Sequence, residues 1–477
     1  MRLNLASVAG AVGAPLPGGA RGDAVITSVT TDSREARPGA LFLCLCGERV
    51  DGHDFALQAA RAGAQAIIAT RPLPDVAAAL PDVPVLLVDD AVIALGQVAA
   101  AWRDTYAGRL IGLTGTAGKT TVKELLASVL SQAGRVARTG RNHNNQIGMP
   151  LSLLAADGGE AFWVMEAGIS HPQDMDELAS VMRPDVALVL NAGSGHTEGL
   201  GDRGVAWYKS RIFTYLPENG LAIASADYPE LTAETLTVQP GARLFSALAD
   251  PRACCLAARV ASRADGDDYE ITCRAPLAPA VFLVSSPLRG QAGAENCAAV
   301  ALCALSLGLT PEQVQAGIAG ATLPGQRFNR VEAGAFRLLD DTYNANPLSM
   351  GRMLDACLEE AAGRPIVLML GEMRELGSLA HACHVELGRH MARLAPELAC
   401  WKGGERDAVL AGLREGGYAG ELVAVSTKDD FAAALDRLSP ATRQSGAVML
   451  FKGSRANRLE DMVAAAVERL GADRGGK

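Results

Sequence analysis

This chain of 477 residues is poor in aromatic side chains and lacks any long apolar run. Aromatic residues make up 4% of it, although hydrophobic residues make up 49%. No stretch approaches about 18 consecutive apolar residues without a charge, which argues against a membrane span. The apolar core of the first residues is too short for a signal peptide, because Asn4 and Ser7 interrupt it. We expect this segment to form the first helix of the fold.

Paired cysteine motifs are also missing. The chain has ten cysteines, but none of them has C-x-x-C spacing, and the nearest neighbours are Cys44 with Cys46 and Cys254 with Cys255. Zinc sites and disulfide frameworks depend on regular spacings that are absent here. The cysteines therefore predict reduced thiols in a cytoplasmic protein.

Basic runs are absent as well. The formal net charge is −9, from 44 basic and 53 acidic residues. No basic segment interleaved with aromatic residues is present, so nucleic acid is not expected as a partner. If the substrates are anionic, local arginines, lysines and helix ends must bind them against the overall negative field.

The length predicts about three domains. Residues 25–88 alternate short apolar strands with small helical stretches, as in a small α/β unit. We place the boundaries after residues 89 and 325, which gives domains over residues 1–89, 90–325 and 326–477.

The middle region repeats an apolar strand followed by a helical pattern. The strands are expected at residues 110–113, 162–165, 186–190 and 221–224. Fully apolar strands of this kind indicate a mostly parallel sheet with helices on both faces, and ligands bind such sheets outside the carboxyl ends of the strands. The pattern restarts in the last part of the chain and predicts a second open α/β sheet with strands at 336–339, 366–370, 422–425 and 448–451.

A glycine-rich loop after the strand at 110–113 predicts a phosphate site. Its residues are Gly115, Thr116, Ala117, Gly118, Lys119, Thr120 and Thr121. Glycines let backbone N–H groups converge on an anion, the helix N-terminus adds positive potential, and the lysine reaches the outer phosphates. Leu113 stands where the strict G-x4-G-K-T pattern needs glycine, so the loop is of a shorter type. The alternative is an ordinary glycine-rich turn before an amphipathic helix.

Other candidate residues also follow predicted strands. Glu166 ends the strand at 162–165, so its carboxylate and the Thr120 hydroxyl are suited to hold Mg²⁺ beside the phosphates of ATP. His196 follows the strand at 186–190 in a glycine-rich loop, where a site role and a structural role are both open. Sequence physics alone assigns Lys209 to a solvated helix face.

The segment 139–150 places amide side chains, including Asn144 and Asn145, beside glycines in one loop. Such groups suit a polar recognition surface, but a tight structural turn explains them equally well.

Together these motifs resemble the Mur ligases, which are ATP-dependent enzymes of peptidoglycan precursor synthesis. The resemblance runs through nearly the whole chain. Within the family it is closest to the members that add D-alanyl-D-alanine to UDP-N-acetylmuramoyl-tripeptide. The residues that carry it are Thr31–Arg34, Pro38–Phe42, Gly47–Phe55, Asp340–Pro347, Leu370–Gly377 and Lys452–Arg455.

The resemblance implies a three-domain fold: a small N-terminal α/β domain that binds the UDP-sugar, a central ATPase domain, and a C-terminal Rossmann-like domain that binds the dipeptide. It also implies two Mg²⁺ ions, one held by Thr120 and Glu166 and the other by His196 and a carbamylated Lys209. Implied contacts to ATP, besides the phosphate loop, are Asn296, Arg327 and Asp341. Implied substrate contacts are Ser33, Arg34, Asn144, Asn145, Asn344, Asn346, Lys452 and Arg455. Lys119, Glu166, His196 and Lys209 are the implied catalytic residues, and we expect a monomer.

The chain departs from the family pattern at several positions. Ala117 replaces an asparagine, Glu295 replaces a histidine, and Ser210 with Arg211 replaces Gly-Glu. One additional residue in the segment 324–327 makes Arg330 a rival of Arg327 as a contact of the γ-phosphate.

Three alternatives are another ligase of the family, a regulatory or transport P-loop NTPase, and a nucleotide-binding protein without turnover. We also expect that the domains can stand open, with the C-terminal motifs far from the phosphate loop.

Overall fold

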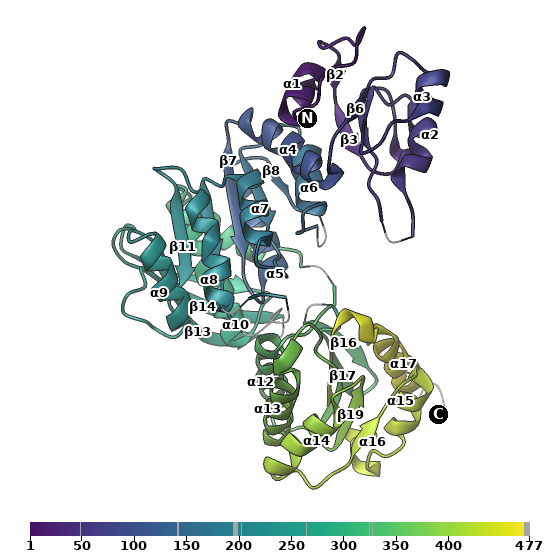
Figure 1. The fold of residues 1–477 in the computed structure, drawn as a ribbon. Coiled ribbons are helices and arrows are strands. Elements are labelled where there is room, and N and C mark those ends of the chain that lie inside the picture. Colours follow the sequence, from purple (N-terminus) through teal and green to yellow (C-terminus); the bar gives the residue numbers. More distant parts are fainter. Residues whose placement is uncertain are drawn as a thin grey trace.

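Three α/β units, each built on one large sheet with its helices, follow one another along the chain. The computed structural model describes residues 1–47, 49–140, 143–193, 199–201, 203–263, 265–323, 325–326 and 328–471. Figure 1 shows the three sheets as separate bodies, with the middle body connecting the N-terminal and C-terminal ones. The three-domain α/β architecture expected from the sequence is confirmed, whereas the exact boundaries at 89 and 325 stay predictions.

The N-terminal body is built on four parallel strands in the order β3-β4-β5-β6. A separate antiparallel pair, β1 and β2, precedes it, and the predicted first helix follows β1 because Asn4 caps it by accepting a hydrogen bond from Ser7 N at 2.7 Å. The elements are β1 (Leu3–Asn4), α1 (Leu5–Ala11), β2 (Val25–Ile26), β3 (Ser28–Thr30), β4 (Ala40–Leu43), α2 (Ala56–Arg61), β5 (Ala66–Ala69), α3 (Pro74–Ala79) and β6 (Val85–Leu87).

The middle body contains nine strands in the order β15-β14-β13-β12-β11-β10-β7-β9-β8. Its strands are β7 (Arg109–Thr114), β8 (Val136–Arg138), β9 (Phe162–Glu166), β10 (Val186–Val189), β11 (Leu221–Ser225), β12 (Arg243–Ser246), β13 (Cys255–Arg263), β14 (Gly266–Cys273) and β15 (Ala280–Ser286). Its helices are α4 (Ala91–Asp104), α5 (Lys119–Leu130), α6 (Gly148–Ala155), α7 (Asp174–Met182), α8 (Gly204–Ser210), α9 (Pro229–Val238), α10 (Gly290–Ser306) and α11 (Pro311–Ala319).

The predicted parallel pairing is confirmed at the centre of this sheet, where β10 pairs with both β7 and β11. Strands β13–β15 were not predicted; β13 continues the parallel pairing from β12, and β14 and β15 then extend the sheet as antiparallel strands. Side chains along β14 and β15 alternate between buried and more exposed positions, because only one face of this extension is covered.

The C-terminal body has six strands in the order β16-β17-β21-β18-β19-β20, of which only β16 is antiparallel to its neighbour. Its strands are β16 (Asn329–Ala333), β17 (Phe336–Asp340), β18 (Ile366–Gly371), β19 (Leu398–Lys402), β20 (Leu422–Ala424) and β21 (Val448–Lys452). Its helices are α12 (Pro347–Ala361), α13 (Ala380–Arg393), α14 (Arg406–Glu415), α15 (Lys428–Leu435), α16 (Pro440–Ser445) and α17 (Glu460–Gly471).

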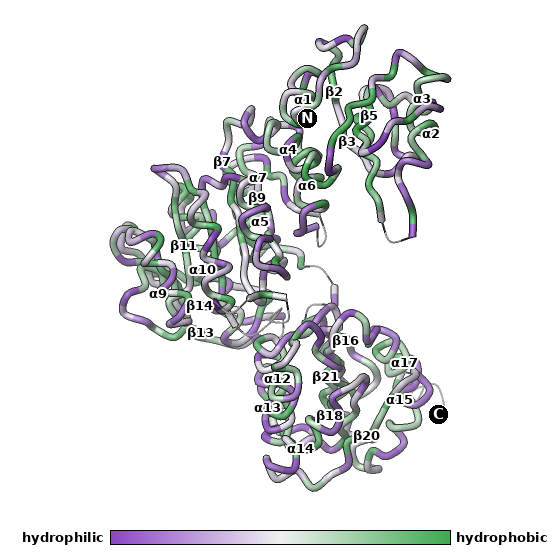
Figure 2. Tube along the Cα trace, in the orientation of Figure 1, coloured by the Kyte–Doolittle hydropathy of each residue, from purple (hydrophilic) through white to green (hydrophobic). Residues whose placement is uncertain are grey.

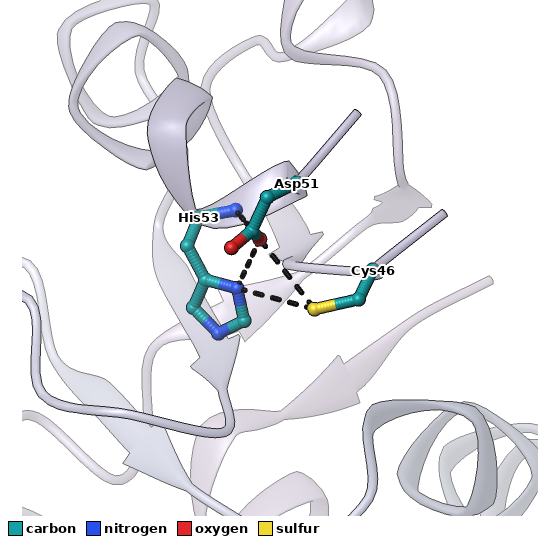
Figure 3. Close-up of side chains that lie close together, drawn as sticks. All are labelled: Cys46, Asp51 and His53. Carbon is teal, nitrogen blue, oxygen red and sulfur yellow. Dashed lines mark hydrogen bonds and ion pairs between the residues drawn. The ribbon is translucent and has the colours of Figure 1, made fainter. Parts of the chain in front are cut away.

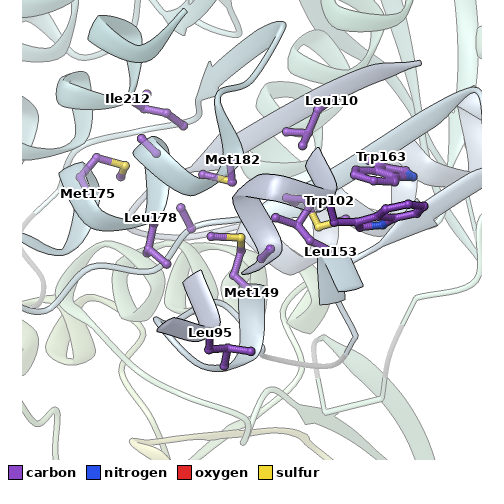
Figure 4. Close-up of a cluster of buried hydrophobic side chains, with 14 of the residues drawn as sticks. Leu95, Trp102, Leu110, Met149, Leu153, Trp163, Met175, Leu178, Met182 and Ile212 are labelled. Atoms are coloured by element: carbon purple, nitrogen blue, oxygen red, sulfur yellow. The ribbon is translucent and has the colours of Figure 1, made fainter. Parts of the chain in front are cut away.

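Aliphatic side chains fill the interior, as the low aromatic content requires. In Figure 2 hydrophobic residues concentrate along strands such as β5 and β11. Figure 4 shows part of one cluster, in which Leu95 and Trp102 from α4 approach Met149 and Leu153 from α6, close to Trp163 of β9. The same cluster continues into the N-terminal sheet, so α4 and α6 join the first two bodies through a shared core.

Small residues allow helices of the middle body to pack very closely. On α10 every residue from 293 to 304 is buried. On α11, a Cβ atom added to Gly317 would lie 2.3 Å from the Cα atom of Val129 on α5. The contact between α5 and α11 therefore leaves no room for a methyl group at this position.

None of the helices in the described part of the chain combines the length and the hydropathy that a transmembrane span requires.

Candidate active site

The phosphate loop connects β7 to α5, as the sequence predicted. Gly118 precedes the helix with φ = +82°, a conformation that favours glycine. A Cβ atom at this position would also lie 3.0 Å from Asn296 Oδ1. Lys119 begins α5 and its Nζ donates a hydrogen bond to Gly115 O at 2.9 Å. The loop therefore places backbone N–H groups, a helix N-terminus and a lysine at one point.

Asn191 holds this loop in place from the end of β10. Its Oδ1 accepts hydrogen bonds from Thr116 N and Ala117 N, both at 2.9 Å, and its Nδ2 donates to Ala117 O at 3.1 Å. The side chain is fully buried. Asn191 was not among the predicted site residues, although its position just after a buried parallel strand was a usable signal.

Glu166 and Thr120 meet beside the loop. Glu166 is 1% exposed at the end of β9, and its Oε2 accepts a hydrogen bond from Thr120 Oγ1 at 3.0 Å. Asn144 Nδ2 donates to the other carboxylate oxygen at 2.8 Å. A carboxylate and a hydroxyl at this distance are a suitable donor set for Mg²⁺, which prefers hard oxygen ligands.

Lys209 is buried, contrary to the solvated helix face that sequence physics predicted. Its side chain on α8 is 2% exposed, and Nζ donates to Gly115 O at 3.1 Å. Burial, with a smaller contribution from the nearby Lys119 charge, lowers the pKa of the Lys209 amine well below its usual value. The prediction failed because the loop and the sheet end cover this face of α8.

Two predicted residues, His196 and Arg327, lie outside the described residues. Arg330, the rival of Arg327, forms an ion pair with Glu360 and does not line the cleft.

The C-terminal body contributes to the same site. Lys452 Nζ, at the end of β21, donates to Asp341 Oδ2 at 2.5 Å and to Asn344 O at 2.8 Å. Asn346 caps α12 and also donates from Nδ2 to Thr116 O of the phosphate loop at 3.1 Å. The C-terminal motifs therefore lie beside the phosphate loop in this structure, and not apart from it as an open arrangement would place them.

Most of these residues line one cavity of about 700 Å³, whereas Asn191 and Lys209 are not part of its lining. Its walls include the loop from Thr116 to Thr121, Asn144, Asn145, Glu166, Asn296, Asp341, Asn344, Asn346 and Lys452. Asn296 is 6% exposed, and its Oδ1 has no hydrogen-bond partner among the described residues. A buried, unsatisfied acceptor in the wall of a polar cavity fits a ligand that carries N–H donors.

The other predicted substrate residues lie elsewhere. In the N-terminal body, Ser33 Oγ donates to Gln58 Oε1 at 3.2 Å, while Arg34 is exposed and pairs with Asp32 at 2.5 Å. Arg455 is also outside the cavity and forms an ion pair with Glu460 at 3.1 Å. Their assignments as substrate contacts stay predictions.

Two of the departures from the family pattern have charged partners. Glu295 forms an ion pair with Arg352 of the C-terminal body. Burial raises the pKa of Glu295, and the Arg352 charge opposes this effect. Arg211, which follows Lys209 by two residues in the sequence, forms an ion pair with Asp176 at 2.9 Å.

Cys46, Asp51 and His53 form a second polar cluster in the N-terminal body (Figure 3). The backbone N–H of Thr70 donates to His53 Nε2 at 3.1 Å, so the ring proton must be on Nδ1. That nitrogen lies 2.5 Å from Asp51 Oδ1 and donates to it. Nε2 therefore uses its lone pair to accept a hydrogen bond, and Nδ1 carries a proton, so neither nitrogen is available to bind a metal. The cluster is best explained as a structural one.

Comparisons with known proteins cover almost the entire chain. Residues 25–103 match the profile described as "Mur ligase family, catalytic domain", residues 113–304 match "Mur ligase middle domain", and residues 326–455 match "Mur ligase, glutamate ligase domain".

Similar proteins include the UDP-N-acetylmuramoyl-tripeptide–D-alanyl-D-alanine ligase of Escherichia coli, which is 35% identical and aligned over 94% of this chain and 95% of its own. The Bacillus subtilis ligase of the same name is 31% identical, with coverage of 93% and 94%. Among solved structures, MurF from Acinetobacter baumannii aligns with a TM-score of 0.85 at 29% identity, covering 98% of this chain and 99% of that one. MurF from Thermotoga maritima in complex with ADP aligns with a TM-score of 0.79 at 27% identity, covering 94% and 99%.

The profile matches span all three bodies, and the relatives align over nearly their full lengths, as the motifs of the cleft predict. This chain belongs to the Mur ligase family.

Proposed function

We propose that the protein joins D-alanyl-D-alanine to UDP-N-acetylmuramoyl-tripeptide and converts ATP to ADP and phosphate. The observation that carries this proposal is the shared cavity, in which a phosphate loop from the middle body faces Asp341, Asn344 and Lys452 from the C-terminal body. A simple NTPase would need only the phosphate loop. The similarity to ligases that carry this activity in their names supports the same assignment.

Making the amide requires an activated acyl group. In the proposed reaction the terminal carboxylate of the tripeptide attacks the γ-phosphate, which gives an acyl phosphate and ADP. The amine of the dipeptide then attacks the acyl carbon and phosphate leaves. The loop N–H groups and Lys119 would stabilise the negative charge in the first step, and the arrangement of the two bodies would hold the reactants together.

The residues beside the loop fit two metal positions. Thr120 and Glu166 supply oxygen ligands for one Mg²⁺, and its chemistry would be to neutralise phosphate charge. We assign Lys209 to the second position, together with His196. The lowered pKa favours the uncharged form of the Lys209 amine, and an uncharged amine can react with CO2 to form a carbamate that offers oxygen ligands.

The roles of the three bodies follow from this proposal. We assign the UDP-sugar to domain 1–89, ATP to domain 90–325 and the dipeptide to domain 326–477. Ser33 and Arg34 would contact the UDP-sugar substrate, with Asn145 and Arg455 as further substrate contacts. The free state of all ten cysteines fits a protein that works in the cytoplasm, and we assign it as a monomer.

A phosphate-release assay in which each substrate is omitted in turn tests the function. We expect phosphate only when ATP, UDP-N-acetylmuramoyl-tripeptide and D-alanyl-D-alanine are all present. Steady release from ATP alone would indicate a P-loop NTPase instead, and binding without release would indicate a nucleotide-binding protein. Release with a free amino acid in place of the dipeptide would indicate another ligase of the family.

A further inference from the structure

Helix α12 of the C-terminal body reaches the phosphate loop and its support at three points. Asn346 Nδ2 donates to Thr116 O at 3.1 Å. Leu348 packs so closely on Gly193 that a Cβ atom on this glycine would lie 3.0 Å from the Leu348 Cβ. One helical turn further along, the Arg352 guanidinium pairs with Glu295. The third contact is the only one of these three that joins two charges.

Glu295 is an unusual residue for its position. It is 3% exposed in the wholly buried part of α10, immediately before Asn296. A buried carboxylate is costly unless a cation and hydrogen-bond donors surround it. Here the cation comes from the other body: Arg352 contacts the carboxylate and also donates to Tyr228 Oη, whose own hydroxyl lies 3.5 Å from Glu295 Oε2.

The second carboxylate oxygen of Glu295 faces Asn191. Asn191 Nδ2 donates to Glu295 Oε1 over 3.5 Å. This contact is long, but it favours the same orientation of the amide as the loop does, because a carboxylate attracts the NH2 group and repels the carbonyl oxygen. In this orientation Oδ1 accepts from Thr116 N and Ala117 N, and Nδ2 also donates to Ala117 O. Arg352, Glu295 and Asn191 thus form a continuous chain of contacts from α12 to the phosphate loop.

We propose that Arg352 and Glu295 are positioning residues that couple the seating of α12 on the middle body to the conformation of the phosphate loop. The coupling rests on the proposed function, because its effect would be to arrange the loop for the phosphates of ATP when the C-terminal body is seated on the middle body. Without Arg352, no cation offsets the burial of Glu295, which favours protonation or displacement of its carboxylate and so weakens its contact with Asn191 Nδ2. Neither residue needs to touch a reacting atom for this effect.

A double-mutant cycle tests the coupling. We expect Arg352→Gln and Glu295→Gln each to lower kcat/KM for ATP by about tenfold to a hundredfold, because small displacements of a phosphate site cost this much. The kcat/KM of the double variant should be at most about twofold lower than that of the less active single variant, because both changes break the same chain of contacts. The loss should fall on both kcat and the KM for ATP, while the KM for the UDP-sugar substrate stays unchanged.

Arg259→Gln is the matched control. Arg259 forms an ion pair with Glu359 across the same pair of bodies, but it does not line the cavity or contact the loop. If Arg352 only holds the two bodies together, Arg259→Gln should have a similar effect on catalysis. We expect it to behave like the unchanged protein.

Hydrogen exchange of the peptide that contains Thr116 and Ala117 gives a readout that needs no substrate. We expect faster exchange in Arg352→Gln and Glu295→Gln, and unchanged exchange in Arg259→Gln. Multiplicative losses in the double variant, or unchanged exchange in Arg352→Gln, would overturn the coupling. Arg352 lies at the interface and not in a core, so this variant decides the question even if Glu295→Gln does not fold. Failure of the unchanged protein to ligate would refute the proposed function but leave the exchange result valid.

Discussion

Replacing Lys209 by methionine separates its chemistry from its packing. Methionine has a similar length and no charge, so it fills the same buried space. The change removes one hydrogen bond to Gly115 O, but that carbonyl still accepts from Lys119 Nζ at 2.9 Å and is not left unpaired. The lost bond is worth about 1 kcal/mol, and the gain from no longer burying an amine opposes it. We expect the free energy of unfolding to change by less than about 1 kcal/mol.

Ligation, in contrast, should nearly disappear in Lys209→Met. If the carbamate of Lys209 holds a metal at the phosphoryl group, its loss removes several kcal/mol of charge stabilisation. A loss of about 4 kcal/mol corresponds to a rate roughly 10³-fold lower.

Lys123 provides a contrasting case, because it is equally buried but paired. Its Nζ donates to Thr139 O at 2.7 Å and lies 3.3 Å from Glu124 Oε1 and 3.9 Å from Glu166 Oε2. Glu124 keeps its ion pair with Arg138 at 2.7 Å, but Lys123→Met would remove the buried cation beside Glu166, which costs about 3 kcal/mol or more. Lys123→Met should therefore lower the free energy of unfolding clearly, whereas Lys209→Met should leave it almost unchanged.

Urea unfolding followed by circular dichroism measures the stabilities, and phosphate release with the complete substrates measures ligation. In ¹³C-bicarbonate the unchanged protein should give a carbamate signal that Lys209→Met lacks and that Lys402→Met, which changes a lysine at the end of β19 in the C-terminal body, retains. Substantial ligation by Lys209→Met, or an equal loss of stability in Lys209→Met and Lys123→Met, would refute this reasoning.

Three further outcomes are expected. Glu166→Gln should raise the Mg²⁺ concentration for half-maximal ligation by at least about tenfold, measured by titration, because a neutral amide is a weaker ligand than a carboxylate; an unchanged titration would exclude Glu166 from the metal site. Asn191→Ala should lower kcat/KM for ATP by about a hundredfold, since Ala117 N and O lose their partner; wild-type kinetics would show that the loop needs no such support. Burial lowers the pKa of His384, so its contribution to stability is complete above pH of about 6.5 and is lost as the pH falls; urea unfolding should show this acid loss, and His384→Gln should reduce its slope.

Sequence alone predicted the parts of the site that follow a simple local pattern. The phosphate loop and Glu166 were predicted because each directly follows an apolar strand, and parallel strands bring their carboxyl ends to one edge. Asn191 and Glu295 were not: Asn191 also follows a buried strand, but its contact with Glu295 joins residues 104 positions apart, which no local pattern reveals. Arg352 reads as an ordinary polar residue on an amphipathic helix. Its role exists only because α12 meets the middle body.

The same distinction holds for the fold. Uninterrupted apolar runs predicted β7, β9 and β10, whereas the half-buried strands β13–β15 carry only a weak alternation and were not recognised. Lys209 shows the opposite error. A lysine on a short helix is usually solvated, and its burial depends on a loop that arrives from nearly a hundred residues away.

The close contact between Gly317 and Val129 determines where catalysis can be disturbed from a distance. Helix α5 carries Lys119 and Thr120 at one end and rests on α11 near the other. An added methyl group at Gly317 must push α5 as a rigid rod, since the helix interior does not compress. The displacement would move Lys119 and Thr120, which lie at the far end of the helix beside the phosphate site. Gly317 touches no substrate, yet its size would determine the position of the nucleotide site. Selection for ATP use would therefore constrain Gly317 as strictly as the residues that line the cleft.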